Sequence, residues 1–183
     1  MSRGHPQDLT GFPARTLRAG TPLYRIFRTG RSPGWFSNDG DGRFDLPFPA
    51  STYYLAEDPL AALLEVTRGL TLLSEAFLEA RQLLTTAASY GYGVTGELSA
   101  TADYTAPQAW ADALHKTGFD GVQYRIRHDP RADLTGVAWF GRSGRLRHPP
   151  PSDRQPLPAS LLLEAAPFGI RVAADLPEPQ PPC

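Results

Sequence analysis

The stretch "YYLAEDPLAALLEV", residues 53–66, limits the folds open to this chain more than any other part of it. Its beginning, within "STYYLA", is rich in aromatic and β-branched residues and predicts a short strand. Asp58 then supplies a helix cap and Pro59 a first-turn proline. We therefore expect a helix from Pro59 to about Arg68, ended by Gly69. The fold must accommodate a strand that leads almost directly into a helix.

The other predicted elements mix strands and helices without a regular βαβ alternation. Strands are expected for "PLYRIFR", "YGYGVTGELSA", "GVQYRIR" and "GVAWFG". Helices are expected for "PQAWADALHKTG", where Pro107 lies in the first turn and Gly118 gives the stop, and for "TLLSEAFLEARQLLTTA", as one helix or a broken pair. This order favours an α+β fold over a doubly wound α/β fold.

The 183 residues suffice for one domain with its own core and are few for two. Residues 1–20 contain several glycines and prolines and predict a loosely ordered lead-in. The domain itself is expected over residues 21–146. Residues 147–183 form a Pro-rich extension, in which "ASLLLEAAPFG" could add a helix and "IRVAA" an edge strand.

Composition excludes several classes of protein. The formal net charge of -1 gives no overall electrostatic reason to bind a nucleic acid or an anionic membrane. The only cysteine is Cys183, which excludes an intrachain disulfide and a cysteine-cluster metal site. No apolar run approaches the length of a membrane span, so a cytoplasmic protein is the default expectation.

Metal binding by other residues is not predicted either. Aligning Gly42 in "SNDGDGRFD" with the glycine of a calcium loop puts Phe48 where the closing glutamate belongs, so an acidic turn is the better interpretation. The four histidines show no metal-ligand spacing. His128 lies at a predicted strand end, where a functional and a purely structural role are equally open.

Two arginines lie next to apolar residues, at positions where a charged side chain is unusual. Arg25 lies in the middle of an apolar strand, and Arg43 lies between a glycine-rich turn and Phe44. A planar guanidinium with five donors suits a pyrophosphate or a carboxylate. The structural alternative is an ion pair with a nearby aspartate: Asp39, Asp41 or Asp45.

Glu65 is the candidate carboxylate. The buried stripe of the predicted helix consists of Leu60, Leu63, Leu64 and Thr67. Glu65 lies on its flank, on the side of Ala61, whose small side chain leaves space for another molecule. The alternative is an exposed glutamate that pairs with Arg68 three residues later.

The motifs "LYRIFR", "GRFDLP", "YYLAEDPLAALLEV", "GFDGVQYRIRHDP" and "GVAWFG", taken in this order, resemble the RES domain family over roughly Pro22 to Phe140. The family is named for an arginine, a glutamate and a serine. Its members include toxins of toxin–antitoxin pairs that destroy NAD⁺ by hydrolysis or phosphorolysis. Their fold is similar to that of ADP-ribosyltransferases, and the resemblance implies the same for residues 21–146.

The resemblance also implies roles for individual residues. The catalytic candidates are Glu65, Arg43 and Tyr54, and the substrate-binding candidates are Tyr24, Arg25, Arg127 and His128. Glu65 would stabilise the ribosyl cation, the arginines would hold the pyrophosphate, and Tyr54 or Tyr24 would stack on the nicotinamide. Ile126 stands where many members have serine. If that serine orients a ribose hydroxyl or the acceptor, Ile126→Ser should speed the reaction.

The function implied by the resemblance is that of an NAD⁺ glycohydrolase or phosphorylase, the toxin of a toxin–antitoxin pair. NAD⁺ would be its substrate, no metal or other cofactor would be required, and an antitoxin protein would cover the site. Self-association into a homo-oligomer stays open, and no direct binding of nucleic acid or membrane is expected. The alternatives are a non-catalytic NAD⁺- or ADP-ribose-binding module and an ADP-ribosyltransferase.

Overall fold

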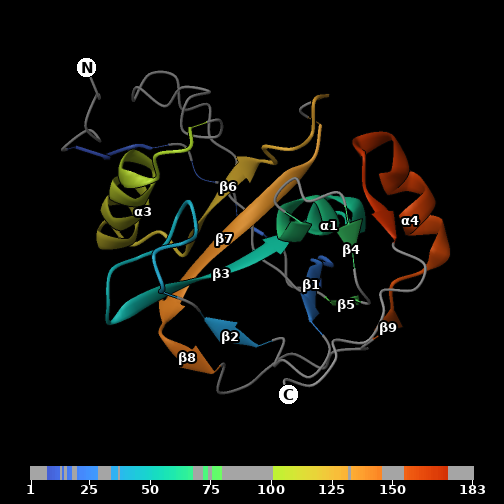
Figure 1. Cartoon of the computed structure of the whole chain (residues 1–183). Helices are drawn as coiled ribbons and strands as arrows, with labels where there is room; N and C mark the ends of the chain where they lie inside the picture. The colour runs from blue at the N-terminus through green and yellow to red at the C-terminus, as the bar shows by residue number, and fades with distance from the viewer. Residues whose placement is uncertain are drawn as a thin grey trace, which may run out of the picture.

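The centre of the fold is an antiparallel sheet with the strand order β3–β7–β6 (Figure 1). The strands are β3 (Ala50–Ala56), β7 (Thr135–Arg142) and β6 (Gly121–Arg125). β3 pairs with β7 along its whole length, from Ala50 opposite Arg142 to Ala56 opposite Gly136. The structure is a computed structural model that describes residues 8–12, 14, 16–17, 20–28, 34–36, 38–67, 72–73, 76–79, 101–131, 133–145 and 155–172.

The two faces of this sheet belong to different parts of the core, because successive side chains of a strand point to opposite faces. Tyr53 and Leu55 of β3 pack in a small cluster with Phe36 of β2 (Trp35–Phe36). Ala56 on the other face belongs to the main core, to which the helices contribute half of the buried side chains. The helices thus cover one face of the sheet, and a short strand covers part of the other.

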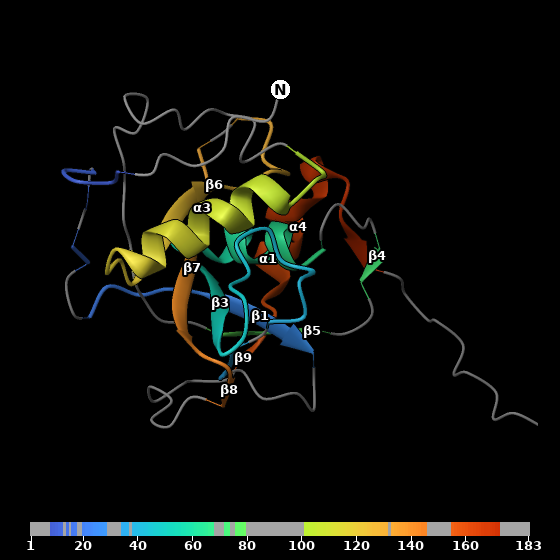
Figure 2. The ribbon, with the colours of Figure 1, turned by 90° about the vertical axis from the view of Figure 1, so that its left-hand side faces the viewer.

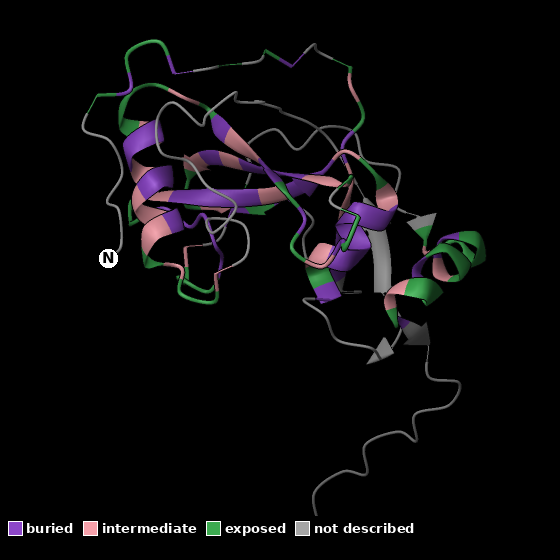
Figure 3. Ribbon diagram, turned by 90° about the horizontal axis from the view of Figure 1, so that it is seen from above, coloured by how far each residue is buried: buried purple, intermediate pink, exposed green. Residues whose placement is uncertain are grey.

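Two helices define the main core. α1 spans Pro59–Thr67 and α3 spans Thr105–Lys116. Figure 2 shows α3 in front of the three strands, and Figure 3 shows that the sides of both helices turned toward the sheet are buried. The predicted cap of α1 is confirmed, because Asp58 Oδ1 accepts hydrogen bonds from the backbone amides of Leu60 (2.7 Å) and Ala61 (3.4 Å).

A second antiparallel sheet lies beside α1 and consists of β1 (Arg25–Arg28), β5 (Ala76–Glu79) and β9 (Gln155–Pro156). Tyr24 joins it to the central sheet. Its amide donates to the carbonyl of Ala56 (2.7 Å), and the amide of Ala56 donates back (2.8 Å). This bridge brings the start of β1 to the end of β3, just before α1 begins.

The remaining elements are short. β2 pairs with β8 (Gly144–Arg145), and β10 (Arg171–Val172) pairs with β4 (Leu72–Leu73). α4 (Ala159–Ala165) continues into the 3₁₀ helix η2 (Ala166–Phe168) and packs beside α1 (Figure 1). α4 lies in the segment for which the sequence predicts a helix. Within the described residues, no helix is both long and apolar enough to span a bilayer.

The predicted α+β class is confirmed, since antiparallel sheets carry the helices on one side. The helix predicted for "TLLSEAFLEARQLLTTA" is wrong in its described part, which contains the strands β4 and β5. β5 pairs in register with β1, from Arg25 opposite Glu79 onward. A short apolar run has no decisive periodicity, and the need of β1 for a partner strand decided its form. The strand predicted for "YGYGVTGELSA" lies outside the described residues.

The described part of the lead-in contributes to the core. Leu9 and Phe12 are buried, and the ring of Phe12 lies 6.2 Å from that of Trp110 and 5.7 Å from that of Phe119. In the C-terminal extension, Leu161 of α4 is buried in the same core. The domain boundaries at residues 21 and 146 stay a prediction.

Candidate active site

A cavity of about 610 Å³ opens between β1, the loop before β3, the second half of α1 and the loop after β6. This volume is in the usual range for small-molecule sites. Every site residue predicted from the sequence lies on its lining: Tyr24, Arg25, Arg43, Tyr54, Glu65, Arg127 and His128. The structure thus gathers these side chains from five separate segments, and their roles stay predictions.

Glu65 reaches the cavity from the flank of α1. The predicted stripe of Leu60, Leu63, Leu64 and Thr67 is buried, whereas Glu65 is half-buried. The hydroxyl of Tyr124 on β6 donates a hydrogen bond to Glu65 Oε1 (3.0 Å). The free space beside Glu65 lies over Ala62, which lines the cavity, and not over Ala61, which is fully buried in the core. The alternative partner Arg68 lies outside the described residues.

Arg43 is buried, with 6 % of its surface exposed, yet it lines the cavity. Its guanidinium carbon lies 5.9 Å from the ring centres of Phe44 and Tyr104 and 5.7 Å from that of Tyr124. Nε and Nη1 make no hydrogen bond to any residue of the described segments. Because buried charged donors without acceptors are unfavourable, an anionic ligand in the cavity would stabilise this arrangement.

The alternative of an ion pair between Arg43 and a neighbouring aspartate is not found in the described part of the chain. Asp45 instead organises the loop. Its Oδ2 accepts hydrogen bonds from the amides of Gly40 (3.1 Å) and Gly42 (2.9 Å), and its Oδ1 accepts one from the hydroxyl of Tyr54 (2.8 Å). Burial raises the pKa of Asp45, and the bonds from Gly42 and Tyr54 oppose that shift.

Position 42 requires glycine, because the loop leaves no space there for a side chain. A Cβ at this position would lie 2.3 Å from Asp45 Oδ1 and 2.4 Å from the hydroxyl of Tyr54. Gln108 of α3 holds the same loop from outside, since its side-chain amide donates to the carbonyls of Gly40 (3.0 Å) and Gly42 (2.9 Å). The turn that presents Arg43 is therefore fixed by contacts from both β3 and α3.

Tyr54 has a structural task beside the one predicted for it. Its hydroxyl donates to Asp45 and accepts a hydrogen bond from the amide of Phe44 (2.8 Å). Burial, followed by the charge of Asp45, raises the pKa of Tyr54 well above its ordinary value, so the phenol stays protonated. Tyr54 thus fixes the two residues that follow Arg43, and the predicted stacking on nicotinamide involves its ring alone.

The other basic residues stand around the cavity. Arg25 lies with its guanidinium carbon 4.3 Å from the ring centre of Tyr53, and its Nη1 donates to the carbonyl of Trp35 (3.4 Å). Arg127 is exposed at the rim. Burial, then the charges of Arg127 and Arg43, lower the pKa of His128, so its imidazole is neutral at pH 7. Three arginines on one cavity offer donors to an anionic ligand, and four carboxylates, those of Asp39, Asp41, Asp45 and Glu65, share the lining.

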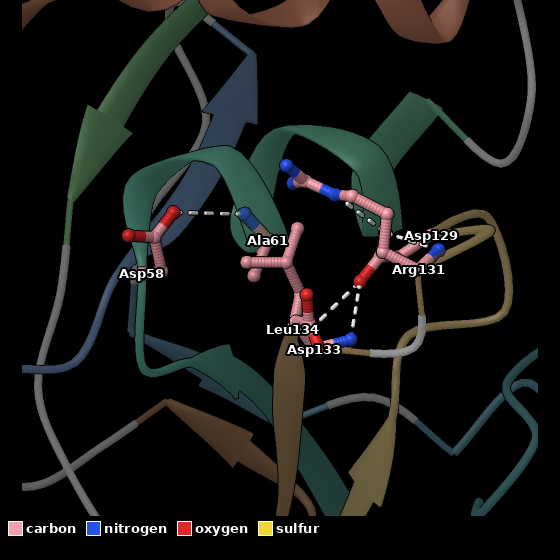
Figure 4. A network of polar contacts seen from close by, with 6 residues as sticks. All are labelled: Asp58, Ala61, Asp129, Arg131, Asp133 and Leu134. Atoms are coloured by element: carbon pink, nitrogen blue, oxygen red, sulfur yellow. Dashed lines mark hydrogen bonds and ion pairs between the residues drawn. The ribbon is translucent and has the colours of Figure 1, made fainter.

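The loop that follows His128 is built around Asp129, which is 5 % exposed (Figure 4). Its carboxylate accepts hydrogen bonds from the amides of Arg131 (3.1 Å), Asp133 (2.8 Å) and Leu134 (2.9 Å). Burial acts to raise the pKa of Asp129, but these bonds outweigh it and lower the pKa. Asp129 therefore fixes the turn that directly follows Arg127 and His128.

Ile126 lies away from the cavity. It is 2 % exposed and belongs to the main core. Its Cδ1 lies 2.9 Å from the point where a Cβ on Gly136 would stand. A serine here would place its hydroxyl among apolar side chains and not beside a substrate. The burial of Ile126 therefore argues against the expectation that Ile126→Ser speeds the reaction.

Sequence reasoning missed several residues of the site. Tyr104, Asp39, Asp41 and Asp45 line the cavity without having been predicted there, and Tyr124 stands behind Glu65. Asp45 had a signal, because an aspartate near glycines typically accepts hydrogen bonds from loop amides. Tyr124 had none, since an aromatic residue in a strand is most simply a core residue.

Comparisons with known proteins identify the family and a similar fold. The RES domain family matches the chain over residues 22–159. No curated protein matches the chain in sequence. Among solved structures, the fold is similar to a chain of the crystal structure of the M. tuberculosis MbcT–MbcA toxin–antitoxin complex, with a TM-score of 0.57 and 18% identity, covering 84% of this chain and 90% of that one. Since the family match covers well over half of the sequence, the chain belongs to the RES domain family.

Proposed function

We propose that this protein degrades NAD⁺ by breaking the bond between nicotinamide and ribose, with water or phosphate as acceptor. The observation that carries the proposal is the cavity that combines the carboxylate of Glu65 with the guanidinium groups of Arg25 and Arg43. Nicotinamide leaves from NAD⁺ as a neutral molecule, so little acid catalysis is needed. The ribosyl carbon develops oxocarbenium character, which a neighbouring carboxylate stabilises.

The remaining residues would hold the substrate. Arg25 and Arg43 supply planar donors for the two phosphates, and two donors of Arg43 have no acceptor in the described part of the protein. The rings of Tyr24 and Tyr54 would border the nicotinamide. Arg127 at the rim would meet a phosphate or the entering acceptor. This chemistry requires neither a metal nor a second cofactor.

We further propose that the protein is the toxin of a toxin–antitoxin pair that acts in the cytoplasm. The similarity in fold to a chain of a toxin–antitoxin complex supports this role. A partner protein that covers the cavity would block access of NAD⁺. The position of Ile126 favours the enzyme over a non-catalytic binding module, because the departure from the family pattern lies in the core and leaves the cavity lining intact.

The direct test is release of nicotinamide from NAD⁺ by the purified chain, with and without phosphate. Glu65→Gln should abolish turnover, because the amide cannot stabilise a developing cation. It should leave the melting temperature nearly unchanged, because its carbonyl oxygen can still accept the hydrogen bond from Tyr124. Thr67→Val is the matched control, since it removes a buried hydroxyl from the same helix away from the cavity and should retain turnover.

Three results would contradict the proposal. A native chain that binds NAD⁺ and releases no nicotinamide would be a binding module. Nicotinamide release that depends on an added macromolecule, with ADP-ribose attached to it, would identify an ADP-ribosyltransferase. A Glu65→Gln variant that keeps its turnover would assign the chemistry to other residues.

A further inference from the structure

Tyr124 stands behind Glu65 and has no part in the chemistry proposed so far. It lies on β6, is 6 % exposed and does not belong to the cavity lining. Its hydroxyl donates to Glu65 Oε1 at 3.0 Å, across 59 positions of the sequence. The bond therefore exists only because the fold brings α1 near β6, and Tyr124 reaches the carboxylate from outside the cavity lining.

The surroundings of Tyr124 hold its phenol in one place. Gly136 is its partner on β7, and a Cβ there would lie 2.6 Å from the ring carbon Cζ and 2.8 Å from the hydroxyl oxygen. The absence of a side chain at Gly136 thus makes the space that the end of the phenol occupies. On another side, the ring of Phe44 packs with its centre 4.8 Å from that of Tyr124.

The hydroxyl is a permanent donor. Burial, followed by the charge of Glu65, raises the pKa of Tyr124 well above its ordinary value, so the phenol keeps its proton over the whole range in which an enzyme works. A hydrogen bond donated to a carboxylate favours its ionised form. It also fixes the direction in which the carboxylate points, which matters because small displacements of a reacting group slow a reaction strongly.

We propose that Tyr124 is a positioning residue, which keeps the carboxylate of Glu65 ionised and oriented toward the ribosyl carbon without touching the substrate itself. This inference rests on the proposed function. A purely structural tyrosine would affect stability alone. A positioning tyrosine also affects the protonation of Glu65 and the rate of the chemical step.

The variant that isolates the hydroxyl is Tyr124→Phe, which keeps the ring against Phe44. We expect kcat for nicotinamide release to fall about tenfold to hundredfold, the range for loss of a hydrogen bond to a charged group. KM for NAD⁺ should stay within about twofold, because Tyr124 does not line the cavity. The acid limb of the kcat profile should move to higher pH. Thr67→Val should change none of these quantities.

A second measurement needs no turnover. In protein labelled with ¹³C at the glutamate carboxyl groups, the resonance missing from Glu65→Gln identifies Glu65. Its titration midpoint should move to higher pH in Tyr124→Phe and stay at the native value in Thr67→Val. An unchanged midpoint in Tyr124→Phe overturns the proposal, as does an unchanged kcat and pH profile in an active enzyme.

The two measurements separate this inference from the proposed function. If the native chain releases no nicotinamide, the proposed function is wrong, and the titration alone then decides whether Tyr124 holds the charge on Glu65. If the native chain is active and Tyr124→Phe behaves like it in rate and titration, the proposed function stands and the positioning role falls.

Discussion

Ile126 replaces the serine of many RES domains, and the variant Ile126→Ser tests whether this position affects the stability of the core or the reaction. The side chain is 2 % exposed and lies in the main core, with its Cδ1 close to Gly136 and Tyr124. Removing a fully buried isoleucine forfeits about 1.5–3 kcal/mol of hydrophobic stabilisation. Burying a hydroxyl without a partner costs about 1–3 kcal/mol more. We therefore expect Ile126→Ser to lower the free energy of unfolding by about 2.5–6 kcal/mol.

The assay is urea denaturation followed by fluorescence, with nicotinamide release measured on the same samples under native conditions. Ile126→Val is the control, and its smaller loss should be about 0.5–1.5 kcal/mol. The folded fraction of Ile126→Ser should have a turnover no higher than that of the native chain. If Ile126→Ser were as stable as the native chain and faster, residue 126 would face the substrate, and the burial argument would be refuted.

Two further predictions concern the loops that carry the arginines. Arg43→Lys should raise KM for NAD⁺ and weaken ADP-ribose binding about tenfold, because one ammonium group cannot replace the two parallel hydrogen bonds of a guanidinium. Binding of nicotinamide should stay unchanged. An unchanged affinity for ADP-ribose, measured by calorimetry, would reject this role. Asp129→Asn should lower the free energy of unfolding by about 1.5–3 kcal/mol at pH 7. Folding lowers the pKa of Asp129 from 3.8, so the ionised carboxylate stabilises the folded state fully above that pH, and this stabilisation is lost as the pH falls through the lowered pKa. If the difference in free energy of unfolding between the native chain and Asp129→Asn does not depend on pH, this account is excluded.

Local signals in the sequence predicted the elements that need little outside help. Asp58 can cap a helix and Pro59 fits a first turn without help from distant residues, so the start of α1 was predictable from the local sequence. The aromatic and β-branched residues of β3 and the apolar stripe of α1 are similarly local signals. The same locality explains the failure at residues 72–79, where the short segment carries no decisive period and β4 and β5 pair with β10 and β1, which are distant in the chain.

The site residues were found in a different way. Ordered motifs marked Glu65, Arg43 and the others as a set, and the structure places all of them on one cavity. The motifs could not distinguish residues that contact a ligand from residues that hold the contacting side chains in position. Tyr54 belongs to the lining and also fixes the turn of Arg43 through Asp45, and this is visible only from the bonds between β3 and the loop.

The sequence alone determined the class of the fold, the capped helix that carries Glu65 and seven of the side chains around the cavity, because each depends on neighbours in the chain or on a recognisable order of motifs. Only the tertiary structure decided that Ile126 is buried, that the space beside Glu65 lies over Ala62, and that Tyr124 binds Glu65. The bond between Tyr124 and Glu65 depends on how α1 packs on the sheet and on the absence of a side chain at Gly136. Such contacts join residues far apart in the chain, and no local pattern encodes them.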